Sequence, residues 1–258
     1  LFFTNRGRVF VLKAYEIPES GRQAKGTAII NLLAVEADER ITAVIQVREF
    51  KPDRFLFLAT KRGVVKKTPL AEFANIRKSG LRAVNLDEDD ELIGVKFTDG
   101  ENRIMLGTRH GKAIAFPEDG VRSMGRVTRG VRGIMLADGD EVVAMDILKS
   151  DSEVLTVTEG GYGKRTAAEE YRTQTRGGKG LINMKVTDKT GPVVGIRVVR
   201  ENQELMLITT EGIVIRTSVN EISRISRNTQ GVRLMTIAEN DRVASMATMN
   251  RIVDTPSE

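Results

Sequence analysis

The chain repeats one short pattern five times, about every fifty residues, and this repetition limits the folds open to it. Each copy starts with an apolar run that contains threonine and ends in a polar turn closed by glycine, at residues 1–7, 56–63, 105–111, 155–161 and 205–212. A second glycine follows at Gly26, Gly80, Gly130, Gly180 and Gly231, 19 residues after the first in four copies and 17 in the second. Paired glycines in phase predict an array or closed ring of one supersecondary unit.

Each copy has the pattern of four short strands. In the fourth copy, residues 154–158 and 162–166 form a predicted hairpin closed by Gly161, and residues 181–186 and 193–199 form a third and fourth strand. The other third strands are predicted at 29–33, 83–86, 134–136 and 234–237, and the other fourth strands at 41–47, 92–97, 142–147 and 243–247. Single helical turns are predicted at 69–73, 167–171 and 218–222. Four strands in about fifty residues is typical of a propeller blade, so the predicted fold is all-β and propeller-like.

The predicted organisation is one domain over residues 1–258, with repeats at 1–50, 54–98, 102–149, 152–199 and 202–249 and a tail at 250–258. The chain begins inside a strand-like run without methionine, so we expect an upstream part, and five blades or a sixth encoded upstream both fit the pattern. The absence of cysteine gives no sign of an oxidising compartment, and no apolar run is long enough to cross a membrane.

Charge is sorted by position within the repeat, although the net charge is only +5. Acidic residues gather between the third and fourth strands, at 36–39, 87–91, 138–141 and 239–241. Basic residues gather in the first hairpin, where the candidate contacts for an anionic partner are Arg6, Arg8, Arg62, Lys66, Lys67, Lys164, Arg165 and Arg216. They gather again before the second glycine, where the candidates are Arg22, Lys25, Arg77, Lys78, Arg126, Arg129, Arg172 and Arg227.

Equivalent positions of a repeat lie at equivalent places in the fold, so we expect these cations to form a continuous basic band, with the acidic turns elsewhere. Such a band suits double-stranded DNA, which carries a phosphate charge about every 1.7 Å of its axis. Binding through phosphates is largely independent of sequence. A curved band favours bent DNA, at a cost of roughly 1–6 kcal/mol for a short duplex.

The most specific local motif lies at residues 174–180. It consists of Gln174, Thr175, Arg176, Gly177, Gly178, Lys179 and Gly180. Three glycines let backbone amides approach a phosphate, and a cation flanks them on each side. The motif lacks the GxxxxGK[ST] pattern of a nucleotide-binding loop, and the alternative interpretation is a simple turn between strands.

Over essentially its whole length the chain resembles the C-terminal domain of the bacterial DNA gyrase A subunit. The most specific stretches are residues 1–9, 29–33, 90–95, 161–166 and 227–231. The family's signature heptad, Q-[RK]-R-G-G-[RK]-G, matches residues 174–180 at six of seven positions, with Thr175 as the departure. The family's main heptad lies in its first blade, so the resemblance implies that this chain starts at the second blade and that the principal heptad lies upstream.

The resemblance implies a β-pinwheel, in which four-stranded blades exchange strands with their neighbours. It implies that the domain wraps duplex DNA on a basic rim and directs the ATP-driven negative supercoiling of a gyrase made of two A and two B subunits. The implied location is the bacterial cytoplasm, at the nucleoid. The alternatives are the related domain of the topoisomerase IV A subunit and a propeller-like protein-interaction scaffold.

No catalytic or metal-binding group stands out in the sequence, and no cofactor is expected. The single histidine, His110, falls in a predicted hairpin turn, and no Cys or His cluster has metal-ligand spacing. Nothing around Tyr15, Tyr162 or Tyr171 resembles the cleavage site of a topoisomerase. The sequence therefore predicts a non-catalytic domain.

Overall fold

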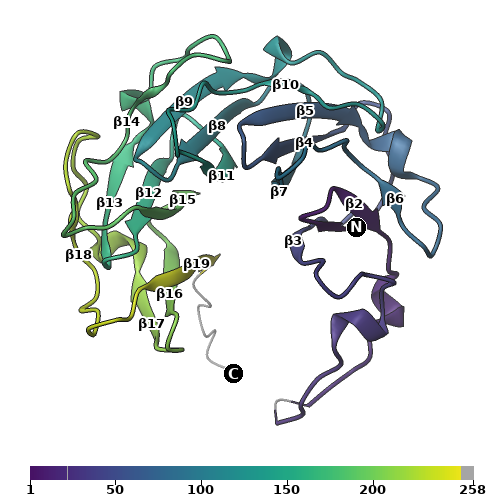
Figure 1. Cartoon of the computed structure of the whole chain (residues 1–258), viewed down its shortest axis with the longest axis horizontal. Helices are drawn as coiled ribbons and strands as arrows, with labels where there is room; N and C mark the ends of the chain where they lie inside the picture. Colours follow the sequence, from purple (N-terminus) through teal and green to yellow (C-terminus); the bar gives the residue numbers. More distant parts are fainter. Residues whose placement is uncertain (22, 251–258) are drawn as a thin grey trace, which may run out of the picture. The chain divides into compact units, whose positions relative to one another are not determined.

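The computed structural model describes residues 1–21 and 23–250, which form β-strands, turns and single turns of 3₁₀ helix (Figure 1). Residues 251–258, most of the predicted tail, lie outside the described residues, and Asn250 ends the last strand. The chain divides into two compact units. The first holds Leu1–Asn102 and Glu118–Gly133, and the second holds Arg103–Pro117 and the residues from Ile134 onward.

The first unit contains two four-stranded antiparallel sheets. In order, one sheet is β3 (Ile41–Val44), β1 (Phe2–Thr4), β2 (Arg8–Phe10) and β6 (Leu81–Arg82). The other is β10 (Val131–Arg132), β5 (Val64–Pro69), β4 (Phe55–Thr60) and β7 (Leu92–Thr98). The core joins strand residues such as Phe3 and Leu56 to Phe73 of the turn η3 (Leu70–Phe73), and the Phe3 and Phe73 rings meet edge to face at 6.0 Å.

The second unit contains three sheets with the same order of strands. The first is β11 (Val142–Ile147), β8 (Arg103–Thr108), β9 (Lys112–Pro117) and β14 (Leu181–Ile182). The second is β15 (Val193–Val199), β12 (Glu153–Thr158), β13 (Tyr162–Ala167) and β18 (Val232–Arg233). The third is β17 (Val214–Ser218), β16 (Gln203–Thr209) and β19 (Val243–Asn250).

The outer strand of each four-stranded sheet comes from the following repeat, as Figure 1 shows for β6 beside β2 and β18 beside β13. The all-β, propeller-like fold with exchanged strands is therefore confirmed. The expectation of four strands in every blade is wrong for the fifth sheet, where three strands are described.

The predicted third strands are the least accurate. Each exchanged strand is only two residues long. It ends there because the next backbone amide donates to the hairpin-turn carbonyl of the preceding repeat instead of continuing the ladder. Examples are Ala83 N–Gly7 O (2.8 Å) and Leu234 N–Gly161 O (2.8 Å). The stretch 29–33 forms the 3₁₀ turn η2 (Ile29–Asn31) instead of a strand, and it pairs with no hairpin edge among the described residues.

The other predicted elements agree more closely with the structure. The fourth strands 142–147 and 193–199 have the predicted bounds. Single 3₁₀ turns occur at the predicted places as η3, η5 (Ala168–Glu170) and η6 (Val219–Glu221), and two more occur as η1 (Ala14–Glu16) and η4 (Glu118–Gly120).

The threonine and first glycine of each repeat build the hairpin turn. The glycine amide donates to the carbonyl of the threonine three residues earlier, at 3.0–3.1 Å in all five repeats. The buried threonine hydroxyl then bonds the backbone of the returning strand, which closes the turn from the inside. The threonines are Thr4, Thr60, Thr108, Thr158 and Thr209.

The second glycine lets the exchanged strand approach the hairpin of the preceding repeat. Gly130 has φ +105°, and a Cβ there would lie 2.5 Å from the carbonyl oxygen of Val65. A side chain would force β10 away from β5 and break the short ladder between them. Strand exchange thus accounts for Gly80, Gly130, Gly180 and Gly231, whereas a Cβ at Gly26 would meet no atom within 4 Å.

We predict that Gly130→Ala destabilises the chain by about 2 kcal/mol or more, because it adds left-handed strain to a backbone clash. Gly125→Ala in the same loop is the matched control, since a Cβ at Gly125 meets no atom within 4 Å. Urea unfolding measures both variants. Equal free energies of unfolding for the two variants would contradict the role given to Gly130.

Candidate nucleic-acid interface

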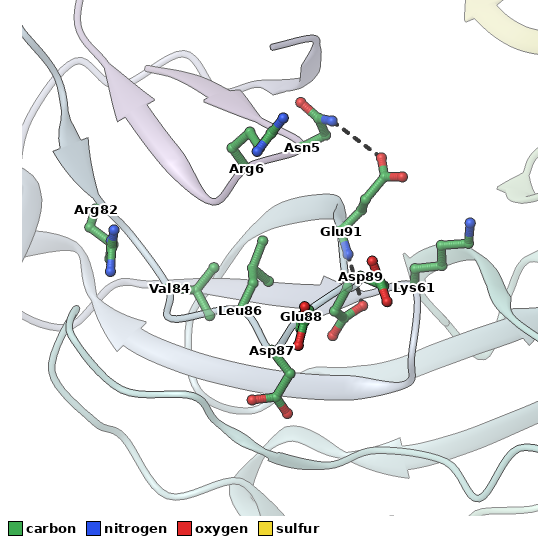
Figure 2. Close-up of a pocket in the computed structure, with 11 residues that line it drawn as sticks. Asn5, Arg6, Lys61, Arg82, Val84, Leu86, Asp87, Glu88, Asp89 and Glu91 are labelled. Carbon is green, nitrogen blue, oxygen red and sulfur yellow. Dashed lines mark hydrogen bonds between the residues drawn. The ribbon is translucent and has the colours of Figure 1, made fainter. Parts of the chain in front are cut away.

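The acidic turns lie against the hairpin turns, which corrects the expectation that the two charges are separated there. In the first unit, Asn5 and Lys61 of two hairpin turns line a hollow with the acidic run Asp87–Glu91 (Figure 2). The Asp90 carboxylate accepts the amide of Arg62 at 2.9 Å. Hairpin turns expose amides that need acceptors, and the aspartates supply them.

Ion pairs neutralise several of the predicted hairpin cations in this way. Arg6 pairs with Asp38, Arg8 lies 2.9 Å from Glu39, and Arg62 lies 3.9 Å from Asp89. In the second unit, the exposed Arg216 pairs with Glu204. The hairpin cations therefore do not form a band free of acidic groups.

Four predicted contacts in the returning strands are buried. Lys66 and Lys164 are 1% and 0% exposed, and Lys67 and Arg165 are 7% and 6% exposed. The Lys67 ammonium donates to the Glu118 carbonyl at 3.2 Å, and the Arg165 guanidinium, paired with Glu153, donates to the Ile222 carbonyl at 2.7 Å. These side chains hold the following repeat in place, which corrects the expectation that they lie on an exposed basic band. We leave all four out of the proposed DNA contacts.

The cations before the second glycine form a second set, in which two exposed arginines are also paired: Arg129 lies 3.0 Å from Asp87, and Arg224 lies 3.0 Å from Glu153. We call these segments the basic loops: residues 77–80 and 122–130 in the first unit, and 172–180 and 224–231 in the second. Their exposed cations are Arg77, Lys78, Arg122, Arg129, Arg172, Lys179 and Arg224. Lys25 of the first repeat is also exposed, and Arg22 lies outside the described residues.

Three of the basic loops share one backbone arrangement. The carbonyl two residues before the second glycine accepts an amide of a neighbouring segment, in Asn85 N–Thr128 O (3.1 Å), Met135 N–Gly178 O (2.9 Å) and Lys185 N–Thr229 O (2.9 Å). Two residues earlier, each loop carries a half-buried arginine. These equivalent arginines are Arg126, Arg176 and Arg227.

The heptad 174–180 is one of these loops. Its backbone is fixed to the hairpin of the third repeat by Gln174 N–Ala115 O at 2.8 Å. Lys179 points to solvent and Arg176 is half-buried, whereas the Gln174 Nε2 atom is buried and has no hydrogen-bond partner among the described residues. The close approach of Gly180 to the Ala113 carbonyl matches that of Gly130 to Val65.

Two acidic residues beneath the basic loops were missed by the sequence reasoning. Glu72 lies 3.5 Å from Arg126, and Glu170 lies 4.0 Å from Arg227. Both occupy the same place in the single helical turn after the hairpin. That repeated placement is the signal that could have revealed them.

Among residues 1–21 and 23–250, no group of three His, Cys, Asp or Glu side chains could hold a metal, and no helix is long and apolar enough to span a membrane. Tyr171 is buried, its hydroxyl donates to Asn183 at 2.5 Å, and burial raises its pKa. His110 is half-exposed beside Asp140. The Arg227 guanidinium lies over the Tyr171 ring, 6.0 Å from its centroid, so Tyr171 packs beneath an arginine of a basic loop.

Burial lowers the pKa of Lys66 and of Lys164 to about 8. At Lys66, the charge of Arg126 lowers the pKa further, and the charge of Glu72 raises it. At Lys164, the charge of Glu170 raises the pKa, and the charge of Arg227 lowers it. Between pH 8 and 10.5 the unfolded chain therefore holds more protons on these lysines than the folded chain.

We predict that these two lysines make the free energy of unfolding rise with pH across this window. Lys164→Met removes one of them, so its stability rises less steeply with pH than that of the wild type. Ile114→Met, at the same position of the third repeat, keeps the wild-type slope. Urea unfolding at several pH values measures this, and parallel profiles for wild type and Lys164→Met would show that Lys164 is not desolvated.

Comparison with known proteins places these features in a family. The family described as DNA gyrase C-terminal domain, beta-propeller, matches residues 1–48, 54–99, 102–149, 152–200 and 203–248. The chain is 48% identical over 254 residues to the DNA gyrase A subunit of Salmonella typhimurium, covering 98% of this chain and 29% of that protein. It is 45% identical over 261 residues to the Staphylococcus aureus gyrase A subunit, covering 100% of this chain and 30% of that protein.

Solved structures give the same result. The C-terminal domain of DNA topoisomerase IV superposes with a TM-score of 0.90 at 27% identity, covering 96% of this chain and 78% of that one. A DNA gyrase A C-terminal domain superposes with a TM-score of 0.83 at 25% identity, covering 96% and 80%. With its five glycine-paired repeats, exchanged strands and family match, this chain belongs to the DNA gyrase C-terminal domain family.

Proposed function

We propose that this chain binds duplex DNA through its basic loops and bends the duplex along them. The observation that carries the proposal is the shared backbone arrangement of three loops, each with an arginine at the same position. Exposed cations accompany these arginines in every loop: Arg122 and Arg129, Arg172 and Lys179, and Arg224. Similar charges on similar backbones suit a ligand whose own charges repeat, as phosphates do along DNA.

The loops favour contact with phosphate over base reading. They are short, closed by glycine, and held by backbone hydrogen bonds to neighbouring segments. Arginine and backbone amides bind phosphate oxygens well, and such contacts position a protein on DNA without specifying sequence. We therefore expect binding that depends little on base sequence.

The relatives give the context for the proposal. They are DNA gyrase A subunits, and the chain spans less than a third of their length. We propose that it is the non-catalytic, DNA-wrapping part of such a protein, acting with the rest of the gyrase A chain and with the gyrase B chain in an A2B2 enzyme in the bacterial cytoplasm. It would need no cofactor of its own, because positioning DNA requires no covalent chemistry.

A second candidate is the equivalent domain of topoisomerase IV, favoured by the TM-score of 0.90 to that domain. The heptad at 174–180 and the identities of 45–48% to gyrase A subunits favour the first. A topology measurement separates binding with wrapping from binding alone.

We predict that the logarithm of the affinity for a duplex falls linearly with the logarithm of the salt concentration. Replacing Arg176 and Lys179 by Ala should reduce the magnitude of the slope by about 1.8, since each phosphate contact contributes about 0.9. Lys51→Ala, an exposed lysine outside the basic loops, serves as the control with unchanged slope. Fluorescence anisotropy measures this, and an unchanged slope for the double variant would remove the heptad from the interface.

We also predict that the chain leaves a change in linking number when it is bound to relaxed closed-circular DNA and the DNA is then relaxed again by a topoisomerase. Wrapping stores writhe, so the change should grow with the amount of protein bound. Gel electrophoresis of the deproteinised plasmid measures it. Binding without any change in linking number would favour the topoisomerase IV-like candidate over a wrapping domain.

A further inference from the structure

Two buried ammonium groups lie directly beneath two of the basic loops. The Lys66 Nζ atom donates to the carbonyls of Ala83 (2.8 Å), Thr128 (3.3 Å) and Arg126. Within the other unit, the Lys164 Nζ atom donates to the Ser226 carbonyl (2.6 Å) and the Arg227 carbonyl. Each lysine thus bonds the backbone of the half-buried arginine of its basic loop, Arg126 or Arg227.

The two lysines occupy the same position of the repeat. Each is the third residue of a returning strand, β5 or β13, and each sits opposite the middle of its partner strand, at Leu58 and Thr156. Apart from the Ala83 carbonyl, their acceptors lie in the basic loop of the following repeat, 60 or more residues away in sequence. The same hydrogen bond from a strand lysine to a loop carbonyl therefore occurs in both units.

The third repeat has no lysine at this strand position. Its equivalent strand position is Ile114, whose Cδ1 atom would lie 3.7 Å from a Cβ at Gly178 in the heptad loop. The acidic position of the helical turn also changes, from Glu72 and Glu170 to Gly120. The lysine and the acidic residue thus occur together under two loops and are both replaced under the third.

A buried ammonium is costly unless its protons find acceptors. Here the acceptors are loop carbonyls, so the lysine and the loop order each other. A fixed carbonyl fixes the backbone from which the arginine side chain projects, and pre-ordered contacts lose less entropy on binding. The lysine also adds a fixed positive charge below the loop.

We propose that Lys66 and Lys164 are positioning residues for DNA binding, which hold the loops 122–130 and 224–231 in the form that presents Arg126 and Arg227 to the phosphate backbone. The proposal rests on the proposed DNA-binding function. It assigns these lysines an indirect role, because burial keeps them from the duplex.

The test compares Lys164→Met, Arg227→Ala and the double variant in the full chain. Lys164→Met should weaken binding to a duplex about five-fold, near the value of one phosphate contact at moderate salt, and should weaken it no further in the Arg227→Ala background. Amide hydrogen exchange should speed up in residues 224–231 and stay unchanged in 172–180. Ile114→Met is the matched control and should alter neither affinity nor exchange.

Two results would overturn the proposal: wild-type affinity in Lys164→Met, or effects of Lys164→Met and Arg227→Ala that multiply, as they would for two direct contacts. If Lys164→Met fails to fold, as judged by circular dichroism, Lys66→Met with Arg126→Ala gives the same test in the other unit. If the wild-type chain does not bind duplex DNA, the proposed function fails and the role in binding fails with it. Hydrogen exchange would then still show whether the lysine holds the loop.

Discussion

The hydrogen bonds between the outer strand of each hairpin and a strand of the following repeat are the constraint on which the rest of this structure depends. A two- or three-stranded sheet leaves a row of unpaired amides and carbonyls at its edge. In four of the five sheets, a strand of two residues covers that edge, and the next amide then bonds the hairpin-turn carbonyl. Because each repeat completes the sheet of the one before it, the turn, the glycines and the loop that leads to the exchanged strand are all fixed by one requirement.

Strand exchange also explains why the basic loops have a fixed shape. A loop that leads into an exchanged strand must cross the hairpin of the preceding repeat at close range, and Gly130 and Gly180 allow that approach. Under two of the basic loops the hairpin strand supplies a buried lysine that bonds the loop backbone, and under the heptad loop the equivalent residue is the apolar Ile114. The same interface that completes the sheet therefore orders the surface that we propose for DNA, which links the stability of the fold to its function.

Electrostatics in this chain depends on burial more than on composition. Cations at neighbouring positions of the repeat have three different environments: buried under carbonyls, as at Lys164; paired with an acidic turn, as at Arg6; and open to solvent, as at Lys179. Exposed ion pairs contribute little to stability and are screened by salt. Burying an ammonium group is costly unless hydrogen-bond acceptors surround it. The surface available to a polyanion is therefore smaller than the count of basic residues indicates.

The sequence by itself determined the repeat, the all-β class, the hairpins and the fourth strands, because these depend on local alternation and on glycine and threonine at fixed spacing. It also located the loops that carry arginine at equivalent positions. Only the tertiary structure decided which cations face solvent, since Lys66 and Arg77 look alike in the sequence and differ only in what packs over them. The tertiary structure alone set the two-residue length of the exchanged strands and made the stretch 29–33 a 3₁₀ turn. A strand needs the edge of a partner strand, and the sequence of a segment does not say whether that edge is present.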